Sequence, residues 1–176
     1  NLPDRTRMIK PYRNFTPKIH ETAFIADDAI VIGDVGIGEN SSVWFGSILR
    51  GDVNYIRIGA RTNLQDGTIV HVDSRELPTI LENDITVGHR VTLHACYIET
   101  GCLIGIGAIL LDGVRVGRNS LVAAGSLLTP GTVIPPGSMV MGSPAKVKRP
   151  LTEDEINGIA RNVAGYVKLS AEYKVR

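Results

Sequence analysis

Three of the four histidines in this chain of 176 residues, His71, His89 and His94, lie within one short stretch. His71 and His89 are 18 residues apart, and His94 follows His89 by five. Three imidazoles that leave a fourth coordination position open form a common ligand set for a catalytic zinc ion. The alternative is that each is an isolated histidine on the surface or in a turn. The elements that position the three side chains decide between these interpretations.

Those elements follow a period of six residues. Aliphatic residues recur at this period in 17 copies, which are Ile25, Val31, Ile37, Val43, Leu49, Ile58, Leu64, Val70, Val87, Leu93, Ile104, Leu110, Val116, Val122, Leu128, Ile134 and Val140. Three positions later, 13 copies have Gly, Asn or Asp, the residue types that best tolerate a positive φ. A tight turn every six residues with a constant buried position is incompatible with a helix, so the repeat predicts a parallel β-helix.

The period breaks in three places. Leu49 and Ile58 are nine residues apart, and Leu93 and Ile104 are eleven apart. The longest break, from Val70 to position 87, includes residues 73–78 and predicts a protruding loop beside His71. A loop that interrupts a repeat next to a histidine indicates a functional region.

The repeat over residues 19–147 resembles that of the hexapeptide-repeat family, whose members form a left-handed β-helix with three flat sides. The expected fold class is all-β with a C-terminal α-helix, in which a single chain forms a left-handed parallel β-helix of hexapeptide repeats. Residues 1–18, which contain three prolines, are expected to form an extended N-terminal arm.

Residues 148–176 are expected to form a helix that packs on the β-helix. Thr152 and Glu155 have the spacing of a capping box. An apolar stripe with helical spacing follows, with Arg161, Asn162 and Lys168 outside it. The stripe consists of Ile156, Ile159, Val163, Tyr166 or Val167, and Ser170.

The composition argues against several kinds of partner. The chain has 19 Lys and Arg residues against 18 Asp and Glu, without a basic run, so we expect neither a nucleic acid nor a membrane surface as partner. It has neither an apolar run long enough for a membrane span nor a signal-peptide pattern. The two cysteines, Cys96 and Cys102, are too few for a disulfide framework, although one bridge is an alternative. The expected location is the cytoplasm.

The spacing of the histidines bears on how a metal is held. At about 18 residues per coil, we expect His71 and His89 on one side of the prism, one coil apart, and His94 on the next side. Side chains on different outer faces diverge, so one chain does not gather all three imidazoles. This predicts a metal held between subunits of a ring-shaped oligomer.

Residues 43–52 and 58–67, together with the three histidines, resemble the gamma-class carbonic anhydrases, which are trimers of left-handed β-helices. The resemblance implies a homotrimer in which His71 and His94 of one subunit and His89 of its neighbour hold Zn2+; Fe2+ and Co2+ also accept three imidazoles. It implies hydration of carbon dioxide to bicarbonate by a zinc-bound hydroxide. The other site residues that it implies are Gln65 and Asn63 beside the metal-bound solvent, Arg50 and Asp52 as an intersubunit pair, and Asp66 as a supporting carboxylate.

The chain departs from this family at two positions. The prototype has acidic residues for proton transfer where this sequence has Val53 and Ser74. Glu76, in the same loop as Ser74, is an alternative relay, although a solvated loop side chain is the simpler interpretation. Cys96 is near enough to His94 in sequence to act as a soft ligand, but we favour a small buried side chain.

Three alternative functions remain open at this point. The ending Gly142–Val147 is similar to that of hexapeptide acyltransferases acting on acyl-CoA, which usually offer a single catalytic histidine as general base. A zinc-dependent thioesterase would use the same ligands and the same hydroxide. A scaffold protein with a relic metal site is the third alternative.

Overall fold

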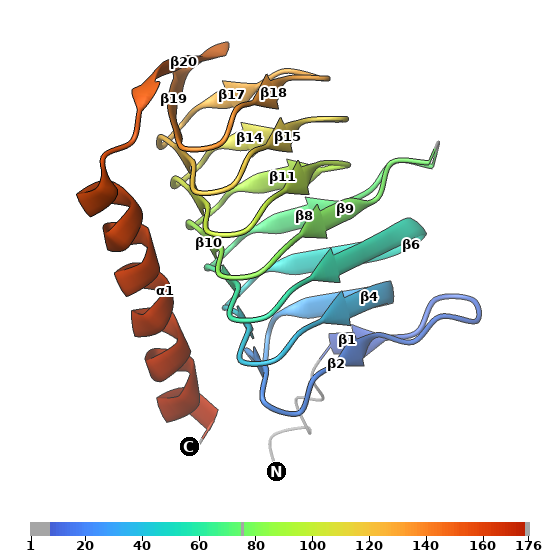
Figure 1. The fold of residues 1–176 in the computed structure, drawn as a ribbon. Helices are drawn as coiled ribbons and strands as arrows, with labels where there is room; N and C mark the ends of the chain where they lie inside the picture. The colour runs from blue at the N-terminus through green and yellow to red at the C-terminus, as the bar shows by residue number, and fades with distance from the viewer. Residues whose placement is uncertain (1–7, 75, 175–176) are drawn as a thin grey trace.

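The computed structural model describes residues 8–74 and 76–174. The first seven residues of the expected arm, position 75 of the expected loop and the last two residues of the C-terminal segment lie outside this description. The described chain forms a stack of coils with three faces, closed on one face by a long helix (Figure 1).

Two of the faces belong to one 12-stranded sheet. The first face contains β8 (Ile69–His71), β11 (Thr92–His94), β14 (Ile109–Leu110) and β17 (Leu127–Leu128). The third face contains β9 (Thr79–Leu81), β12 (Tyr97–Ile98), β15 (Arg115–Val116) and β18 (Val133–Ile134). The long strands β4 (Ile30–Ile37) and β6 (Ile48–Ile58) join these faces, because β6 pairs with β8 near its start and with β9 near its end.

The second face is an eight-stranded sheet. Its strands are β3 (Phe24–Ile25), β5 (Ser42–Val43), β7 (Asn63–Leu64), β10 (Thr86–Val87), β13 (Leu103–Ile104), β16 (Leu121–Val122), β19 (Ser138–Gly142) and β20 (Ala145–Pro150). Only β20 pairs antiparallel, with β19. Part of the arm also joins the 12-stranded sheet, since β1 (Met8–Lys10) and β2 (Lys18–Ile19) both pair in parallel with β4.

The repeat determines this architecture as predicted. The aliphatic position points inward in every coil, and Val43, Leu64, Leu93, Leu110 and Val122 are fully buried. The turn position has a positive φ where Gly or Asn occupies it, as at Asn40, Gly67, Gly107 and Asn119, and also where Arg61 and Arg90 replace them. The predicted fold class is confirmed: the chain is a parallel β-helix of hexapeptide repeats with a C-terminal helix. The predicted loop is also present, between β8 and β9, and protrudes from the stack (Figure 1).

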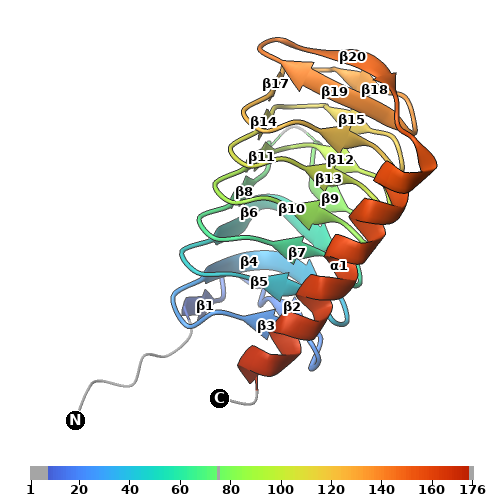
Figure 2. The same ribbon diagram turned by 90° about the vertical axis from the view of Figure 1, so that its left-hand side faces the viewer.

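Helix α1 (Glu153–Lys174) covers the second face and runs back along the stack (Figure 2). The predicted capping box is formed: the backbone N–H of Thr152 donates to Glu155 at 2.8 Å, and that of Glu155 donates to Thr152 Oγ1 at 3.2 Å. Ile159, Val163 and Ser170 are the buried positions of the helix. No helix within the described ranges has the length and apolar character needed to cross a membrane.

Candidate functional site

His71 and His94 lie side by side on the first face. They end strands β8 and β11, which pair in parallel with His71 opposite His94. The expectation that His71 would share a side with His89, one coil apart, with His94 on the next side, was therefore wrong, because the residue opposite His71 is His94. The coil that carries the loop between β8 and β9 is longer than 18 residues, and one full turn separates His71 from His94, 23 residues later.

A continuous chain of polar contacts runs through the two imidazoles. His71 Nδ1 lies 3.1 Å from His94 Nε2, and His71 Nε2 lies 2.9 Å from Asp52 Oδ1. His94 Nδ1 lies 2.5 Å from Asp112 Oδ1. Each imidazole thus has one ring nitrogen directed at the other imidazole and the second directed at a carboxylate. We call these residues, with Arg50, the His71–His94 cluster.

Asp52 is the carboxylate of this cluster with the most polar contacts. It forms an ion pair with Arg50, and its Oδ1 also accepts the backbone N–H of Val53 at 2.9 Å. Burial alone would raise the pKa of Asp52, but the hydrogen bonds from His71 and Arg50 outweigh burial and hold this pKa below its ordinary value. Asp52 is thus ionised at neutral pH and orients the His71 ring.

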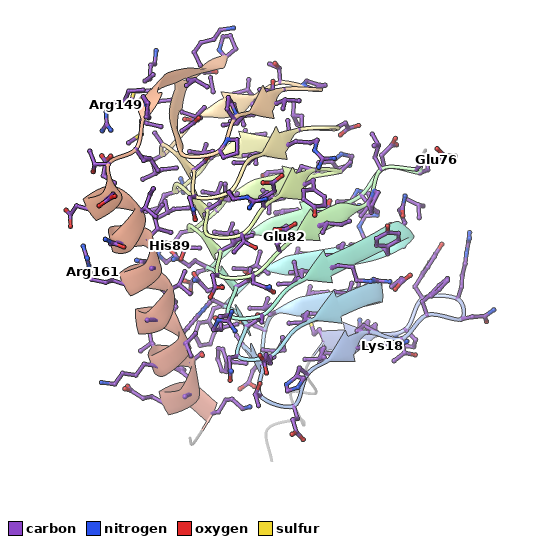
Figure 3. The ribbon with its side chains drawn as sticks, in the orientation of Figure 1. Lys18, Glu76, Glu82, His89, Arg149 and Arg161 are labelled. Carbon is purple, nitrogen blue, oxygen red and sulfur yellow. The ribbon has the colours of Figure 1, made fainter. Side chains whose placement is uncertain are left out.

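His89 lies apart from this pair, in the turn between β10 and β11. Its Nδ1 is 2.9 Å from Asp66 Oδ2, and both side chains are partly exposed. The side chain of His89 is on the side of the prism next to α1 (Figure 3). Burial raises the pKa of Tyr166 on α1, and the negative charge of Asp66 raises it further. The helix therefore lies close to the His89 turn.

Two further predicted site residues accompany His89. Strand β7 pairs with β10, so Gln65 lies beside the start of the His89 turn, and its backbone N–H donates to Val87 at 3.0 Å. Gln65 Nε2 donates to Asn63 Oδ1 at 3.2 Å, and both side chains are buried. His89, Asp66, Gln65 and Asn63 form what we call the His89 cluster.

The two clusters lie at opposite ends of strand β11, whose three residues span about 10 Å. The structure thus brings the eight predicted residues together as two groups of four. Among the described residues, no set of three or more His, Cys, Asp or Glu side chains is close enough to hold a metal within one chain.

Sequence reasoning missed Asp112 and Asn162. Asp112 follows His94 by 18 residues, one regular coil, and this interval is the signal that could have identified it. Asn162 is on α1, where its Oδ1 accepts the Thr86 hydroxyl at 2.8 Å, and Thr86 Oγ1 in turn accepts Asn63 Nδ2 at 2.9 Å. The helix is thereby connected through Thr86 and Asn63 to Gln65.

The remaining candidates fall outside both clusters. Cys96 is buried, and burial raises the pKa of its thiol to about 12, which fits a small core side chain rather than a thiolate ligand. Both cysteines are free, so the alternative of a disulfide is not realised. Val53 follows Asp52 on β6 and is 48% exposed. Ser74 and Glu76 are exposed in the loop, with Glu76 near its tip (Figure 3).

Comparison with known proteins extends these observations. Residues 95–130 match the family model described as bacterial transferase hexapeptide (six repeats). The chain is 47% identical over 167 residues to a carbonic anhydrase of Geobacillus kaustophilus, covering 95% of this chain and 91% of that protein. It is 45% identical over 160 residues to gamma carbonic anhydrase 2 of Arabidopsis thaliana, a mitochondrial protein, covering 88% of this chain but only 58% of the plant protein.

Among solved structures, a Bacillus cereus protein described as a candidate acetyltransferase has a TM-score of 0.95 and 45% identity, with 97% of this chain and 98% of that chain covered. Fold and repeat define a hexapeptide-repeat protein. Within this class, the identity over most of its length shows that the chain belongs to the gamma carbonic anhydrase family.

Proposed function

We propose that this protein is a metal-dependent carbonic anhydrase of the gamma class that hydrates carbon dioxide to bicarbonate at the subunit interfaces of a homotrimer. The observation that carries the proposal is the division of the predicted site into two clusters at opposite ends of β11. Each cluster supplies what the other lacks: two imidazoles in one, and a third imidazole with an amide side chain in the other.

The donor set suits a divalent metal. His71 and His94 already face each other at 3.1 Å, and Asp52 and Asp112 bind their outer nitrogens, an arrangement that fixes ring orientation in metal-binding histidines. His71 and His94 of one subunit and His89 of the next would hold Zn2+, with Fe2+ or Co2+ as alternatives. When bound, such a metal lowers the pKa of a coordinated water to about 7 and supplies hydroxide at neutral pH.

The first face has the properties of a subunit interface. Between the edge with His89 and the edge with His71 and His94, it presents outward aliphatic side chains; Ile69 is 38% and Ile109 40% exposed. Contact between the two different edges of neighbouring chains is heterologous, and a heterologous contact with a suitable rotation closes into a ring. This supports a trimer in which each interface completes one metal site.

The remaining cluster residues have positioning roles in this proposal. Because Gln65 Nε2 donates to Asn63, Gln65 presents Oε1 as an acceptor that would orient the reacting water. Asp66 holds the His89 ring through Nδ1. Arg50 and Asp52, which pair with each other within the chain, would lie at the interface, with Asp52 also fixing His71.

Proton removal is the step for which this chain is least equipped. Val53 and Ser74 are not proton carriers, and Glu76 is an exposed side chain near the tip of its loop (Figure 3). We expect turnover to rise with the concentration of a small buffer such as imidazole, which would carry the proton instead.

The direct experiment is metal analysis of protein purified without oxygen, combined with an assay of carbon dioxide hydration. The proposal predicts one metal per chain, activity that disappears after chelation, and recovery on adding Zn2+, Fe2+ or Co2+. Metal-free protein with unchanged activity would refute it.

We further propose a cytoplasmic location, where the two free thiols remain reduced.

A second candidate function, acyl transfer from acyl-CoA, is favoured by the similarity to the Bacillus cereus structure. A zinc-dependent thioesterase would use the same clusters. Assays with acetyl-CoA separate these candidates: release of free CoA without an acceptor indicates hydrolysis, and release only with an acceptor indicates transfer. A protein that binds metal but shows neither of these activities nor hydration would favour a scaffold role.

A further inference from the structure

A cavity of about 250 Å³ opens on the third face, next to the His71–His94 cluster. It is formed by the segments that continue from His94, from Asp112 and from the loop after β8. Its apolar lining consists of Leu77, Pro78, Ile80, Ala95, Cys96 and Val114. Ala95, Cys96 and Val114 are buried, whereas Leu77 is 39% exposed. The cavity is thus an apolar depression with a buried floor and one wall contributed by the loop.

The polar feature of this cavity is the guanidinium of Arg115. Arg115 lies opposite Tyr97 in the pairing of β12 with β15, and its Cζ is 4.7 Å from the centre of the Tyr97 ring. Stacking of this kind fixes the direction of the guanidinium while leaving N–H groups available. Within residues 8–74 and 76–174, Arg115 forms no ion pair, unlike Arg118 on the same coil, which pairs with Glu99.

The acidic groups near the cavity are already engaged. The Glu82 carboxylate accepts the Tyr97 hydroxyl at 2.5 Å and the backbone and hydroxyl of Thr100, each at 2.9 Å. Asp112 accepts from His94. Neither of these carboxylates neutralises Arg115 through a direct ion pair, so the guanidinium is suited to an external anion.

We propose that this cavity binds a small organic carboxylate, with the carboxylate on Arg115 and an apolar body against the accessible side chains of Leu77, Pro78 and Ile80. Ligand pockets combine such apolar linings with a few polar groups that fix orientation. At the roughly 30 Å³ that a water occupies in the liquid, the volume suits about eight non-hydrogen atoms, far more than carbon dioxide has. The inference is independent of the proposed function, because it involves no metal and no reaction.

Benzoate is the probe, and binding is measured by calorimetry and by chemical-shift changes of the cavity methyl groups on the intact protein. Benzamide, of the same shape but without charge, is the matched ligand. We expect Arg115→Gln and the exchange of benzoate for benzamide each to weaken binding about tenfold or more, because a hydrogen-bonded charge is lost. Arg118→Gln is the control variant and should bind as the unmodified protein does.

Arg115→Lys should retain part of the affinity for benzoate. Leu77→Ala should weaken benzoate binding, because it removes one wall of the cavity. Shifts confined to Leu77, Ile80 and their neighbours would support the assignment. Three results would overturn it: no binding of benzoate to the unmodified protein, equal affinity of benzoate and benzamide, or equal weakening by Arg115→Gln and Arg118→Gln. Because the benzamide comparison needs no variant, it holds even if Arg115→Gln fails to fold.

Discussion

The middle and late coils of the β-helix differ in regularity. From β13 to β16, each strand pairs with a partner 18 residues later, as Leu103 with Leu121 and Ile109 with Leu127. Between β6 and β10, the partners are further apart: Ile48 pairs with Ile69 and Asn63 with Thr86. All eight predicted site residues lie in the irregular region or directly after it.

The difference teaches where this fold can place chemistry. A regular coil devotes its residues to inward aliphatic side chains and tight turns, so it has little room for polar clusters. Extra residues at the corners leave the inner positions in place, because Leu64, Val70 and Leu93 remain fully buried. They also extend β6 to carry Arg50 and Asp52 next to His71.

The largest expected effect is the loss of metal when a histidine of the His71–His94 cluster is replaced. His94→Ala should abolish metal binding and reduce hydration activity more than about 100-fold, since loss of even an outer-shell partner commonly costs 10–100-fold. His20→Ala is the matched control, because His20 is outside both clusters and contacts Thr22. Metal content and activity are measured on both variants. A full complement of metal in His94→Ala would contradict the assignment.

Core substitutions test whether the two regions share one kind of packing. Leu93 in the irregular region and Leu110 in the regular region are both fully buried. Leu93→Ala and Leu110→Ala should each lower the free energy of unfolding by about 2–5 kcal/mol, since each leaves a cavity in the same inner column. Chemical denaturation measures both. A marked loss of stability in only one of the two variants would mean that the irregular and regular coils pack differently.

Asp112 tests the difference between the irregular and the regular coils, because it is the site residue that a regular coil contributes. Asp112→Asn should weaken metal binding by about 10–100-fold while leaving the fold unchanged, since the amide orients His94 less well than the carboxylate. Competition with a chelator gives the affinity. Asp154→Asn, on the exposed side of α1, is the control. Equal metal affinity in the two variants would remove Asp112 from the site.

The smallest effect concerns the cap of α1, remote from both clusters. The hydrogen bond from Arg149, with those from Thr152, lowers the pKa of Glu155 to about 2. Because the folded pKa is below the unfolded value of about 4.3, the carboxylate stabilises the protein above that value, and the contribution is lost as the pH falls towards 2. The difference in Tm between the unmodified protein and Glu155→Gln should therefore shrink over this range. A constant difference would argue against the ionised cap.

The sequence predicted the coils better than the relation between them. The aliphatic period and the turn residues identified the inner positions, because each follows from local burial and from φ. The side-by-side pairing of His71 and His94 did not follow, since an interval of 18 was applied to a coil that the loop lengthens. The residues were assigned by resemblance, whereas their grouping needed the strand register.

Contacts between distant elements were also beyond sequence reasoning. The capping box was visible because its two members are three residues apart. The link from Asn162 through Thr86 to Asn63 depends on where α1 lies along the second face, and no local pattern encodes that position. Asp112 is intermediate between the capping box and the Asn162 link. Its interval of 18 residues from His94 is regular, but its contact with His94 is seen only in the structure.

The central claim is that each site takes residues from two subunits, and mixed oligomers test it most directly. His71→Ala and His89→Ala chains, each inactive alone, are unfolded, mixed in equal amounts and reassembled. With random mixing in a trimer, about one quarter of the interfaces combine an intact His71–His94 cluster with an intact His89. Metal binding and activity should recover to about that fraction. A mixture of His71→Ala with His94→Ala should recover nothing, because both ligands belong to one cluster. No recovery in the first mixture, or equal recovery in both, would contradict a shared site.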